Sequence, residues 1–270
     1  MSGIEAVRAW EHTASTVGST AGSAPGFSPV AAPVTETLAA DSWRVDDGLV
    51  LAFDRHRSRF ADAVAQAGGD RHEALRAAGH AMAEVPAEGS WSPRLDLTPE
   101  GIRLRIRPAP EASGSVTVAT AARDPRTLPL RKGPDLAALA VLQAEESARA
   151  GVAVEPVITV DGLVAEGGWS ALLWWRGDVL CVPAADIPQL PSVTAAVLDE
   201  LARESGVEVR QERSRPADLE GCEVWLANAL RGIRAVDRWI DGPSVAPASR
   251  AADWQARLDR LRVAPAVGAR

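Results

Sequence analysis

A lysine and a glutamate constrain the fold of this chain more than any other feature. One predicted helix and one strand–turn signal separate them. Lys132 stands directly before a helical run, and Glu166 ends a strand–turn signal 34 residues later. Pro134 suits the first position of the helix, and Gly151 suits its C-terminal stop. The order of lysine, helix, strand, turn and glutamate indicates mixed α/β structure with both side chains at the ends of elements.

Lys132 and Glu166 have residue types that suit cofactor chemistry. A lysine that attacks a carbonyl must lose its proton, and burial or a helix N-terminus lowers its pKa. Lys132 is a rare lysine in a chain whose cations are almost all arginine, which hints at a need for a primary amine. A carboxylate such as Glu166 can keep a pyridine nitrogen protonated. The alternative for each is a solvated side chain at an element end.

Composition excludes several classes of protein. The chain has 270 residues, is 46% hydrophobic and 24% charged, and carries a net charge of −7, which fits a globular protein of two domains. The acidic balance argues against nucleic-acid binding. No apolar stretch reaches ~18 residues and no secretory signal is visible, so we expect neither a membrane span nor export. Cys181 and Cys222 make no disulfide framework, which fits the cytoplasm. No metal site is predicted.

The pattern along the chain predicts four segments. Residues 1–40 are expected to be a mostly disordered extension with a short helix at Ile4–Trp10, 41–123 a small α/β domain, 124–131 a linker, and 132–270 a larger domain. In the small domain we expect strands at Ser42–Val45, Leu49–Phe53, Ile102–Arg107 and Val116–Ala121, the last two paired, and helices at Arg55–Gln66 and Arg71–Met82. In the larger domain we expect strands at Val154–Val160, Ala171–Trp175, Val179–Val182, Val207–Arg210 and Glu223–Ala227, and helices at Val193–Arg203 and Ala251–Leu261.

The Lys132–Glu166 interval, with the segment D-G-L-V-A-E that ends at Glu166, resembles the aminotransferase class IV family. This family includes branched-chain and D-amino-acid aminotransferases and aminodeoxychorismate lyases. The resemblance implies an α/β (α+β) protein of pyridoxal-phosphate fold type IV, with a small α/β domain and a larger domain with a β-barrel-like core. It also implies pyridoxal 5'-phosphate in a cleft between the domains, a small-molecule amine or amino-acid substrate, and a homodimer.

The same resemblance assigns roles to single residues. Lys132 would be catalytic and carry the cofactor as a Schiff base, and Glu166 would bind its pyridine nitrogen. The phosphate would bind to Arg59 and to the backbone of Val193 and Thr194 at a helix start, where free N–H groups attract anions. The remaining candidates are Asn228 and Ala229 at the cofactor's edge, and Arg107 for a substrate carboxylate. Arg59 can also be read as part of a basic helix face, and Arg107 as a solvated arginine beside Arg103 and Arg105.

Departures from the family pattern bear on the reaction. Ala171 stands where an asparagine is common, the chain has no tyrosine, and the strand predicted at Leu49–Phe53 has no hydroxyl. The segment Asn228-Ala229-Leu230 resembles the lyase branch. The first hypothesis is therefore an aminodeoxychorismate lyase that forms p-aminobenzoate and pyruvate for folate biosynthesis. The alternatives are a class IV aminotransferase acting on a D- or branched-chain amino acid or an amine, and a cofactor-binding relative without turnover.

Overall fold

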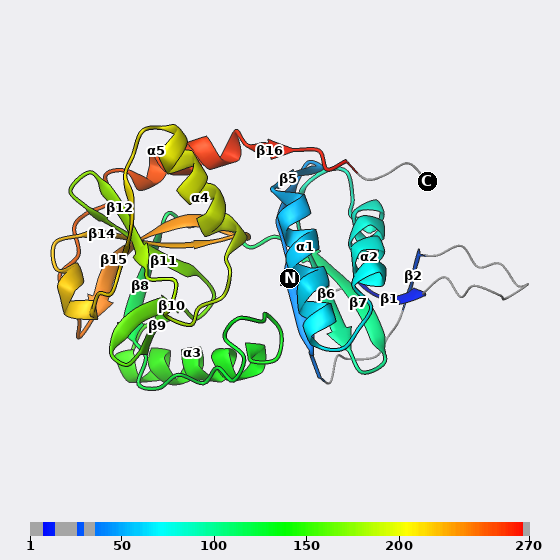
Figure 1. The fold of residues 1–270 in the computed structure, drawn as a ribbon, viewed down its shortest axis with the longest axis horizontal. Coiled ribbons are helices and arrows are strands. Elements are labelled where there is room, and N and C mark those ends of the chain that lie inside the picture. Colours follow the sequence, from blue (N-terminus) through cyan, green and yellow to red (C-terminus); the bar gives the residue numbers. More distant parts are fainter. Residues whose placement is uncertain (1–7, 14–25, 30–35, 267–270) are drawn as a thin grey trace, which may run out of the picture. The chain divides into compact units, whose positions relative to one another are not determined.

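The chain folds into two compact units, described from a computed structural model that covers residues 8–13, 26–29 and 36–266 (Figure 1). Unit 1 comprises Met1–Pro110, Arg131–Pro134 and Arg262–Arg270, and unit 2 comprises Glu111–Leu130 and Asp135–Leu261. These limits differ from the domain boundaries that the sequence suggested. The segment around Lys132 belongs to unit 1, although the local pattern placed it at the start of the larger domain.

The described strands of unit 1 form an antiparallel sheet, which carries two helices. The strands follow the order β16-β5-β4-β6-β7-β1-β2, and β3 also pairs with β6. The strands are β1 (Arg8–Thr13), β2 (Gly26–Pro29), β3 (Ala39–Ser42), β4 (Val45–Asp46), β5 (Leu49–Leu51), β6 (Ser90–Thr98), β7 (Gly101–Pro108) and β16 (Arg262–Val263), and the helices are α1 (Phe53–Gln66) and α2 (Arg71–Glu84). The α2 helix begins where the Asp70 side chain accepts hydrogen bonds from two backbone N–H groups.

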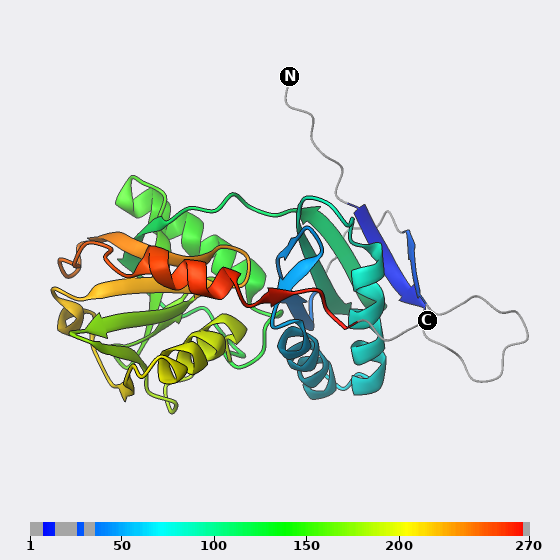
Figure 2. The same cartoon turned by 90° about the horizontal axis from the view of Figure 1, so that it is seen from above.

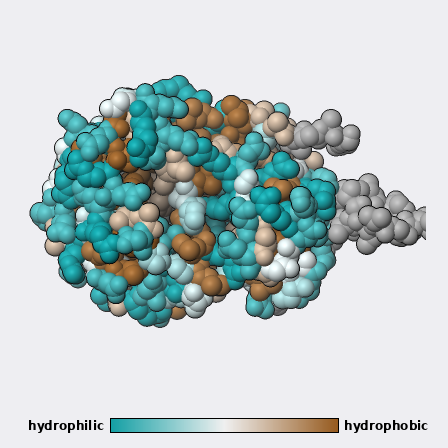
Figure 3. Space-filling model, viewed as in Figure 1, coloured by the Kyte–Doolittle hydropathy of each residue, from teal (hydrophilic) through white to brown (hydrophobic). Residues whose placement is uncertain are grey.

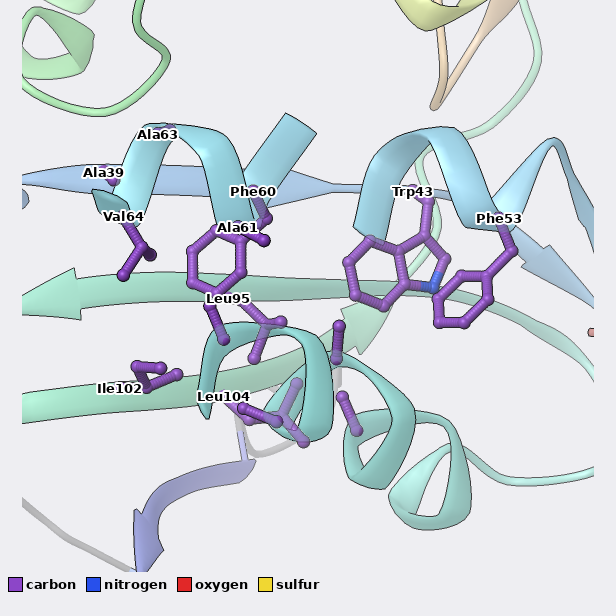
Figure 4. Close-up of a cluster of buried hydrophobic side chains, with 14 of the residues drawn as sticks. Ala39, Trp43, Phe53, Phe60, Ala61, Ala63, Val64, Leu95, Ile102 and Leu104 are labelled. Atoms are coloured by element: carbon purple, nitrogen blue, oxygen red, sulfur yellow. The ribbon is translucent and has the colours of Figure 1, made fainter. Parts of the chain in front are cut away.

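The core of unit 1 lies between these helices and one face of the sheet. Figure 4 shows Phe60 and Val64 of α1 beside Leu95 of β6 and Leu104 of β7. Trp43, next to β3, is fully buried in the same cluster. Because side chains alternate along a strand, the opposite sheet face is left for polar residues.

Unit 2 contains a closed ring of strands. The order is β10-β9-β8-β15-β14-β11, and β10 also pairs with β11, which closes the ring, while β12 and β13 extend beyond it. This arrangement confirms the expected barrel-like core. The strands are β8 (Ser115–Thr120), β9 (Glu155–Val160), β10 (Leu163–Gly167), β11 (Ala171–Arg176), β12 (Val179–Pro183), β13 (Val209–Glu212), β14 (Glu223–Asn228) and β15 (Gly232–Ile240). Helices α3 (Leu136–Ala150) and α4 (Val193–Glu204) lie on opposite sides of these strands, α5 (Ala251–Asp259) follows β15, and a 3₁₀ turn spans Pro216–Leu219 (Figures 1 and 2).

Several predictions about strands were wrong because strand pairing is not local. The expected pairing of Ile102–Arg107 with Val116–Ala121 does not occur, since β7 pairs with β6 and β8 pairs with β9 and β15. The sequence pattern missed both β6 and β15. Within the predicted extension, Arg8–Thr13 is a strand on the edge of β7, so the helix expected at Ile4–Trp10 is not formed in its described part. The other predicted disordered positions lie largely outside the described residues.

Hydrophilic residues cover most of the surface seen in Figure 3, with hydrophobic residues in small separate areas. Within the described ranges, the most exposed large hydrophobic side chains include Leu130, Val141 and Val263. No helix there combines the length and the apolar character needed to cross a membrane.

Candidate active site

Lys132 is the single lysine of the sequence, and its backbone is fixed against β3 in unit 1. The N–H of Ala40 donates a hydrogen bond of 2.7 Å to the carbonyl oxygen of Lys132. The next residue, Gly133, has φ of +137°, and a Cβ there would lie 2.7 Å from the Cα of Ala39. A glycine is therefore required for this close approach. Pro134 lies outside α3, whose first residue is Leu136, so the predicted helix start was two residues early.

The amine of Lys132 is partly buried and lies 3.3 Å from the hydroxyl oxygen of Ser42. Burial lowers the pKa of Lys132 to about 8, the negative charge of Asp41 opposes this shift, and the positive charges of Arg59 and Arg94 add to it. Near neutral pH a fraction of the amine is therefore unprotonated, which is the form that attacks a carbonyl carbon.

Arg59 and His56, on α1, both bind the fully buried carboxylate of Asp41 in β3. Arg59 donates from Nε and Nη2 at 2.7 and 2.8 Å, and the Nδ1 of His56 lies 3.0 Å from Oδ1. Arginine and histidine together hold the pKa of Asp41 far below its usual range, although burial acts in the opposite direction. Arg59, which was expected at the phosphate, and His56 thus join α1 to the strand next to Lys132, and the side chain of Arg59 keeps a 17% exposed fraction.

Arg107, the candidate for a substrate carboxylate, is exposed near the end of β7. Burial of part of its side chain, and then the positive charges of Arg94 and Arg105, lower its pKa. The backbone of Arg107 pairs with Ser92 in the sheet, but its side chain forms no hydrogen bond or ion pair with another residue in the described part of the chain. It is therefore available to an anion.

Glu166 is the penultimate residue of β10 in unit 2 and is 8% exposed. Its Oε1 accepts a hydrogen bond of 2.5 Å from Nη1 of Arg126, and its Oε2 accepts one of 3.0 Å from the N–H of Leu190. Burial raises the pKa of Glu166, and the charge of Arg126 opposes the rise. A carboxylate has about four acceptor positions, so these two donors leave room for a third.

The N-terminus of α4 has the features expected of an anion-binding helix start. Ser192 caps the helix, with its hydroxyl accepting from the N–H of Ala195 at 3.2 Å. Val193 and Thr194 are the first two residues of the helix, and both are buried. Backbone N–H groups in the first turn have no acceptor within the helix, so they can donate to a phosphate.

Asn228 shapes a turn at the end of β14. Its Oδ1 accepts from the N–H groups of Leu230 and Arg231 at 3.0 and 2.9 Å, and its Nδ2 donates to the hydroxyl of Ser170. The side chain therefore makes three hydrogen bonds and keeps one N–H of Nδ2 unused. Ala171, the departure from the family pattern, pairs directly with Glu166 across the two strands.

The sequence pattern missed three participants in these groups: Asp41, Ser42 and Arg126. Arg126 lies in the segment that was predicted to be a linker, and its Nε and Nη2 bind Asp124 while Nη1 binds Glu166. The Asp-Pro-Arg sequence gives no periodic signal, so only a search for a cation near Glu166 could have found it. Ser42 was expected to be a plain strand residue.

The predicted site residues fall into two groups. Lys132, Arg59 and Arg107 belong to unit 1, whereas Glu166, Val193, Thr194, Asn228 and Ala229 belong to unit 2. Across the described ranges, no group of three or more histidine, cysteine, aspartate or glutamate side chains is arranged to hold a metal ion.

The sequence profile of the amino-transferase class IV family matches residues 38–239, and the chain belongs to this family. The fold is similar to that of the fold IV-transaminase CpuTA1 from Curtobacterium pusillum, at 22% identity and a TM-score of 0.74, covering 93% of this chain and 97% of that one. An aminotransferase from Brucella abortus bound to the cofactor PLP matches at 17% identity and a TM-score of 0.73, covering 94% of this chain and 98% of that one. A candidate 4-amino-4-deoxychorismate lyase from Legionella pneumophila matches at 15% identity and a TM-score of 0.70, covering 83% of this chain and 90% of that one. No curated protein matches the sequence.

Proposed function

We propose that this protein is a pyridoxal-phosphate-dependent lyase that converts 4-amino-4-deoxychorismate to p-aminobenzoate and pyruvate. The observation that carries the proposal is the hydroxyl of Ser42 at 3.3 Å from the amine of Lys132. The strand at Leu49–Leu51 has no hydroxyl to assist the lysine, and Ser42 supplies one from β3 instead. The segment Asn228-Ala229-Leu230 adds support, because it resembles the lyase branch of the family.

The side chains fit this cofactor. Lys132 offers a primary amine of lowered pKa for its aldehyde, and Glu166 offers an acceptor for its ring nitrogen. The first turn of α4, at Val193 and Thr194, and the guanidinium of Arg59 would hold its phosphate. When bound, the cofactor withdraws electrons from the amine-bearing carbon of the substrate.

The reaction requires Lys132 to move one proton. With the cofactor and substrate bound, the free Nζ of Lys132 would remove the proton from the amine-bearing carbon. The C–O bond to the enolpyruvyl group would break as the ring becomes aromatic, and the leaving group would take up a proton to become pyruvate. A pKa of about 8 suits a base that works near neutral pH. Ser42 would keep Nζ directed by its hydrogen bond. We also place the enzyme in folate biosynthesis in the cytoplasm, as a homodimer.

A class IV aminotransferase is the second candidate, favoured by the absence of a hydroxyl side chain in Leu49–Leu51. Lys132 and Glu166 would have the same roles, but the products would be a keto acid and an aminated cofactor. Arg107 would bind the carboxylate of the amino acid, which suits its lack of a partner among the described side chains.

The test begins with pyridoxal phosphate added to the purified protein and the excess removed. We expect a visible absorption band, and borohydride reduction should attach one cofactor, with peptide mapping placing it at Lys132, the single lysine. Pyruvate and p-aminobenzoate are then measured with 4-amino-4-deoxychorismate, in parallel with amino-group exchange between D-alanine or leucine and 2-oxoglutarate.

Two variants complete the test. Lys132→Ala should lose the band and at least about a thousandfold in turnover, because no second lysine can replace it. Ser42→Ala should keep the band and lose about tenfold in the rate of pyruvate release, corresponding to about 1.4 kcal/mol. A band without pyruvate release, combined with amino-group exchange, would establish the aminotransferase. A band with neither activity would leave a cofactor-binding protein without turnover.

A further inference from the structure

Unit 2 encloses a buried ion pair that contains none of the predicted site residues. Nη2 of Arg234, in β15, donates a hydrogen bond of 2.5 Å to Oε2 of Glu155, in β9. The two residues are 4% and 3% exposed. Oε1 of Glu155 also accepts a hydrogen bond from the N–H of Trp169 at 3.1 Å. The pair therefore reaches the segment that follows Glu166.

The hydroxyl of Ser170 joins this ion pair to the Asn228 turn, which comprises residues 228–231. Its Oγ accepts one hydrogen bond from Nη2 of Arg234 at 3.0 Å and a second from Nδ2 of Asn228 at 2.9 Å. A serine oxygen has two acceptor positions, so both are occupied. Asn228 in turn holds the backbone of its own turn through Oδ1. One arginine nitrogen thus acts, through one hydroxyl, on the turn that contains Ala229.

The same ion pair supports the turn that follows Glu166, at residues 167–170. The N–H of Gly167 donates a hydrogen bond of 2.7 Å to the carbonyl oxygen of Ser170, which closes this turn. A Cβ on Gly167 would lie 2.8 Å from Oε1 of Glu155, so the glycine lets the carboxylate approach the backbone closely. Two segments that were predicted to contact the cofactor therefore share one buried support.

The contacts of Arg234 indicate a role in orientation more than in stability. Among the described residues, Nη2 makes both hydrogen bonds of the guanidinium, whereas Nε is buried without a partner. A buried donor that lacks an acceptor is destabilising. A buried ion pair is also weak evidence for stability, because apolar side chains of similar volume often do as well. The arginine is therefore best explained by the two oxygens that Nη2 holds in place.

We propose that Arg234 is a positioning residue for cofactor binding: Glu155 orients it, and it fixes Ser170 between the turn that follows Glu166 and the Asn228 turn. Groups that bind a ligand must be held within about 0.5 Å of the productive geometry, and supporting side chains supply this order. The inference rests on the proposed function for the cofactor alone, since neither the lyase nor the aminotransferase reaction is assumed.

Two substitutions of Arg234 test the orientation of Ser170. A single nitrogen makes both contacts, so a lysine ammonium with its three N–H groups can replace it, whereas methionine cannot. Arg234→Met should weaken the binding of pyridoxal phosphate to the cofactor-free protein about tenfold, as measured by titration of the visible band. Arg234→Lys should stay within about threefold of the wild type. If Arg234→Met fails to fold, as judged by circular dichroism, Ser170→Ala removes the shared acceptor and tests the same support.

Glu223→Gln is the matched control for a general loss of stability. Glu223 is 3% exposed and accepts hydrogen bonds from the N–H groups of Arg250 and Ala251 at the start of α5. It is the first residue of β14, whereas Asn228 is the last. Glu223→Gln should lower the urea midpoint of unfolding and leave the affinity for pyridoxal phosphate unchanged.

Amide hydrogen exchange in the cofactor-free protein gives a second readout. The N–H groups of Leu230 and Arg231 donate to Oδ1 of Asn228, so they report on the turn itself. Arg234→Met should increase their exchange rates about tenfold and leave the exchange within α4 unchanged, because the loss of support is local.

Unchanged cofactor affinity in Arg234→Met, or equal losses of affinity in Arg234→Met and Glu223→Gln, would overturn the proposal. The exchange readout separates this inference from the proposed function. If the wild type shows no visible band, the proposed function fails and the exchange decides the role of Arg234. Faster exchange at Leu230 and Arg231 would then support the positioning role, and unchanged exchange would overturn it.

Discussion

Asp41 in unit 1 and Glu166 in unit 2 are buried carboxylates that each bind one arginine and one backbone N–H, yet their pKa values move in opposite directions. The pKa of Asp41 falls because Arg59 grips it with two nitrogens and His56 adds a third contact. The pKa of Glu166 rises because burial outweighs one nitrogen of Arg126, whose other donors bind Asp124 and Pro188. Asp41 is a saturated structural anion, whereas Glu166 can accept a further cation.

The largest expected effect separates these two carboxylates. Asp41→Asn should lower the free energy of unfolding by about 3 kcal/mol, because it leaves Arg59 and His56 without their buried partner. Glu166→Gln should cost about 1 kcal/mol, because Arg126 keeps Asp124 and the amide oxygen can still accept a hydrogen bond. Urea unfolding of both variants at pH 7 measures the difference, and equal losses would contradict the comparison.

The same pair predicts an acid dependence. The folded pKa of Asp41 is lowered, so its contribution to stability is present above the unfolded pKa of about 3.9 and is lost as pH falls further below it. The difference in the free energy of unfolding between the wild type and Asp41→Asn should therefore become smaller in acid.

A smaller effect tests how the backbone holds Lys132. Gly133→Ala should lower the free energy of unfolding by about 2–3 kcal/mol, because a φ of +137° is strained for alanine and the new Cβ would meet the backbone of Ala39. Gly151→Ala is the matched control, since this helix-terminal glycine has φ of +67° and no atom within 4 Å of a built Cβ, and it should cost about 1 kcal/mol. Gly133→Ala should also weaken the visible band. Equal costs in urea unfolding would show that the close approach to β3 does not matter.

The smallest effect concerns the charge of Lys132. Its folded pKa of about 8 lies below the ordinary value of 10.5, so the unfolded chain binds more protons between these limits and stability rises with pH. The amine is partly exposed, so the full effect is reduced. Across this pH range we expect the free energy of unfolding to rise by about 1–2 kcal/mol relative to Lys132→Met. The chain has no tyrosine and no second lysine, so few other groups titrate there. If the free energy of unfolding changes with pH by the same amount in both proteins, the lowered pKa of Lys132 is excluded.

Local patterns predicted most of the helices. The limits of α1, α2 and α4 agree with the predicted ranges to within two residues. These features depend on neighbours within a few residues, such as Asp70 and the N–H groups that it caps. Lys132 and Glu166 were identified differently, because their interval and the segment D-G-L-V-A-E resemble the family.

Pairing between distant segments could not be predicted in the same way. The register of β6 with β7, which gathers the arginines on one face, depends on contacts across a sheet. The β10–β11 pairing that closes the ring in unit 2 also depends on the tertiary structure. In a strand each residue alternates between two faces, so the sequence shows which residues group together but not which strand they meet.

The sequence by itself determined the family, the single amine and the carboxylate at a fixed interval. The tertiary structure decided what surrounds them: Ser42 beside Lys132, Arg126 on Glu166, and Asp96 between two arginines. The physical reason is that residue type and spacing fix which chemistry is available. The pKa of an amine or a carboxylate is set by burial and by charges that folding brings from far along the chain.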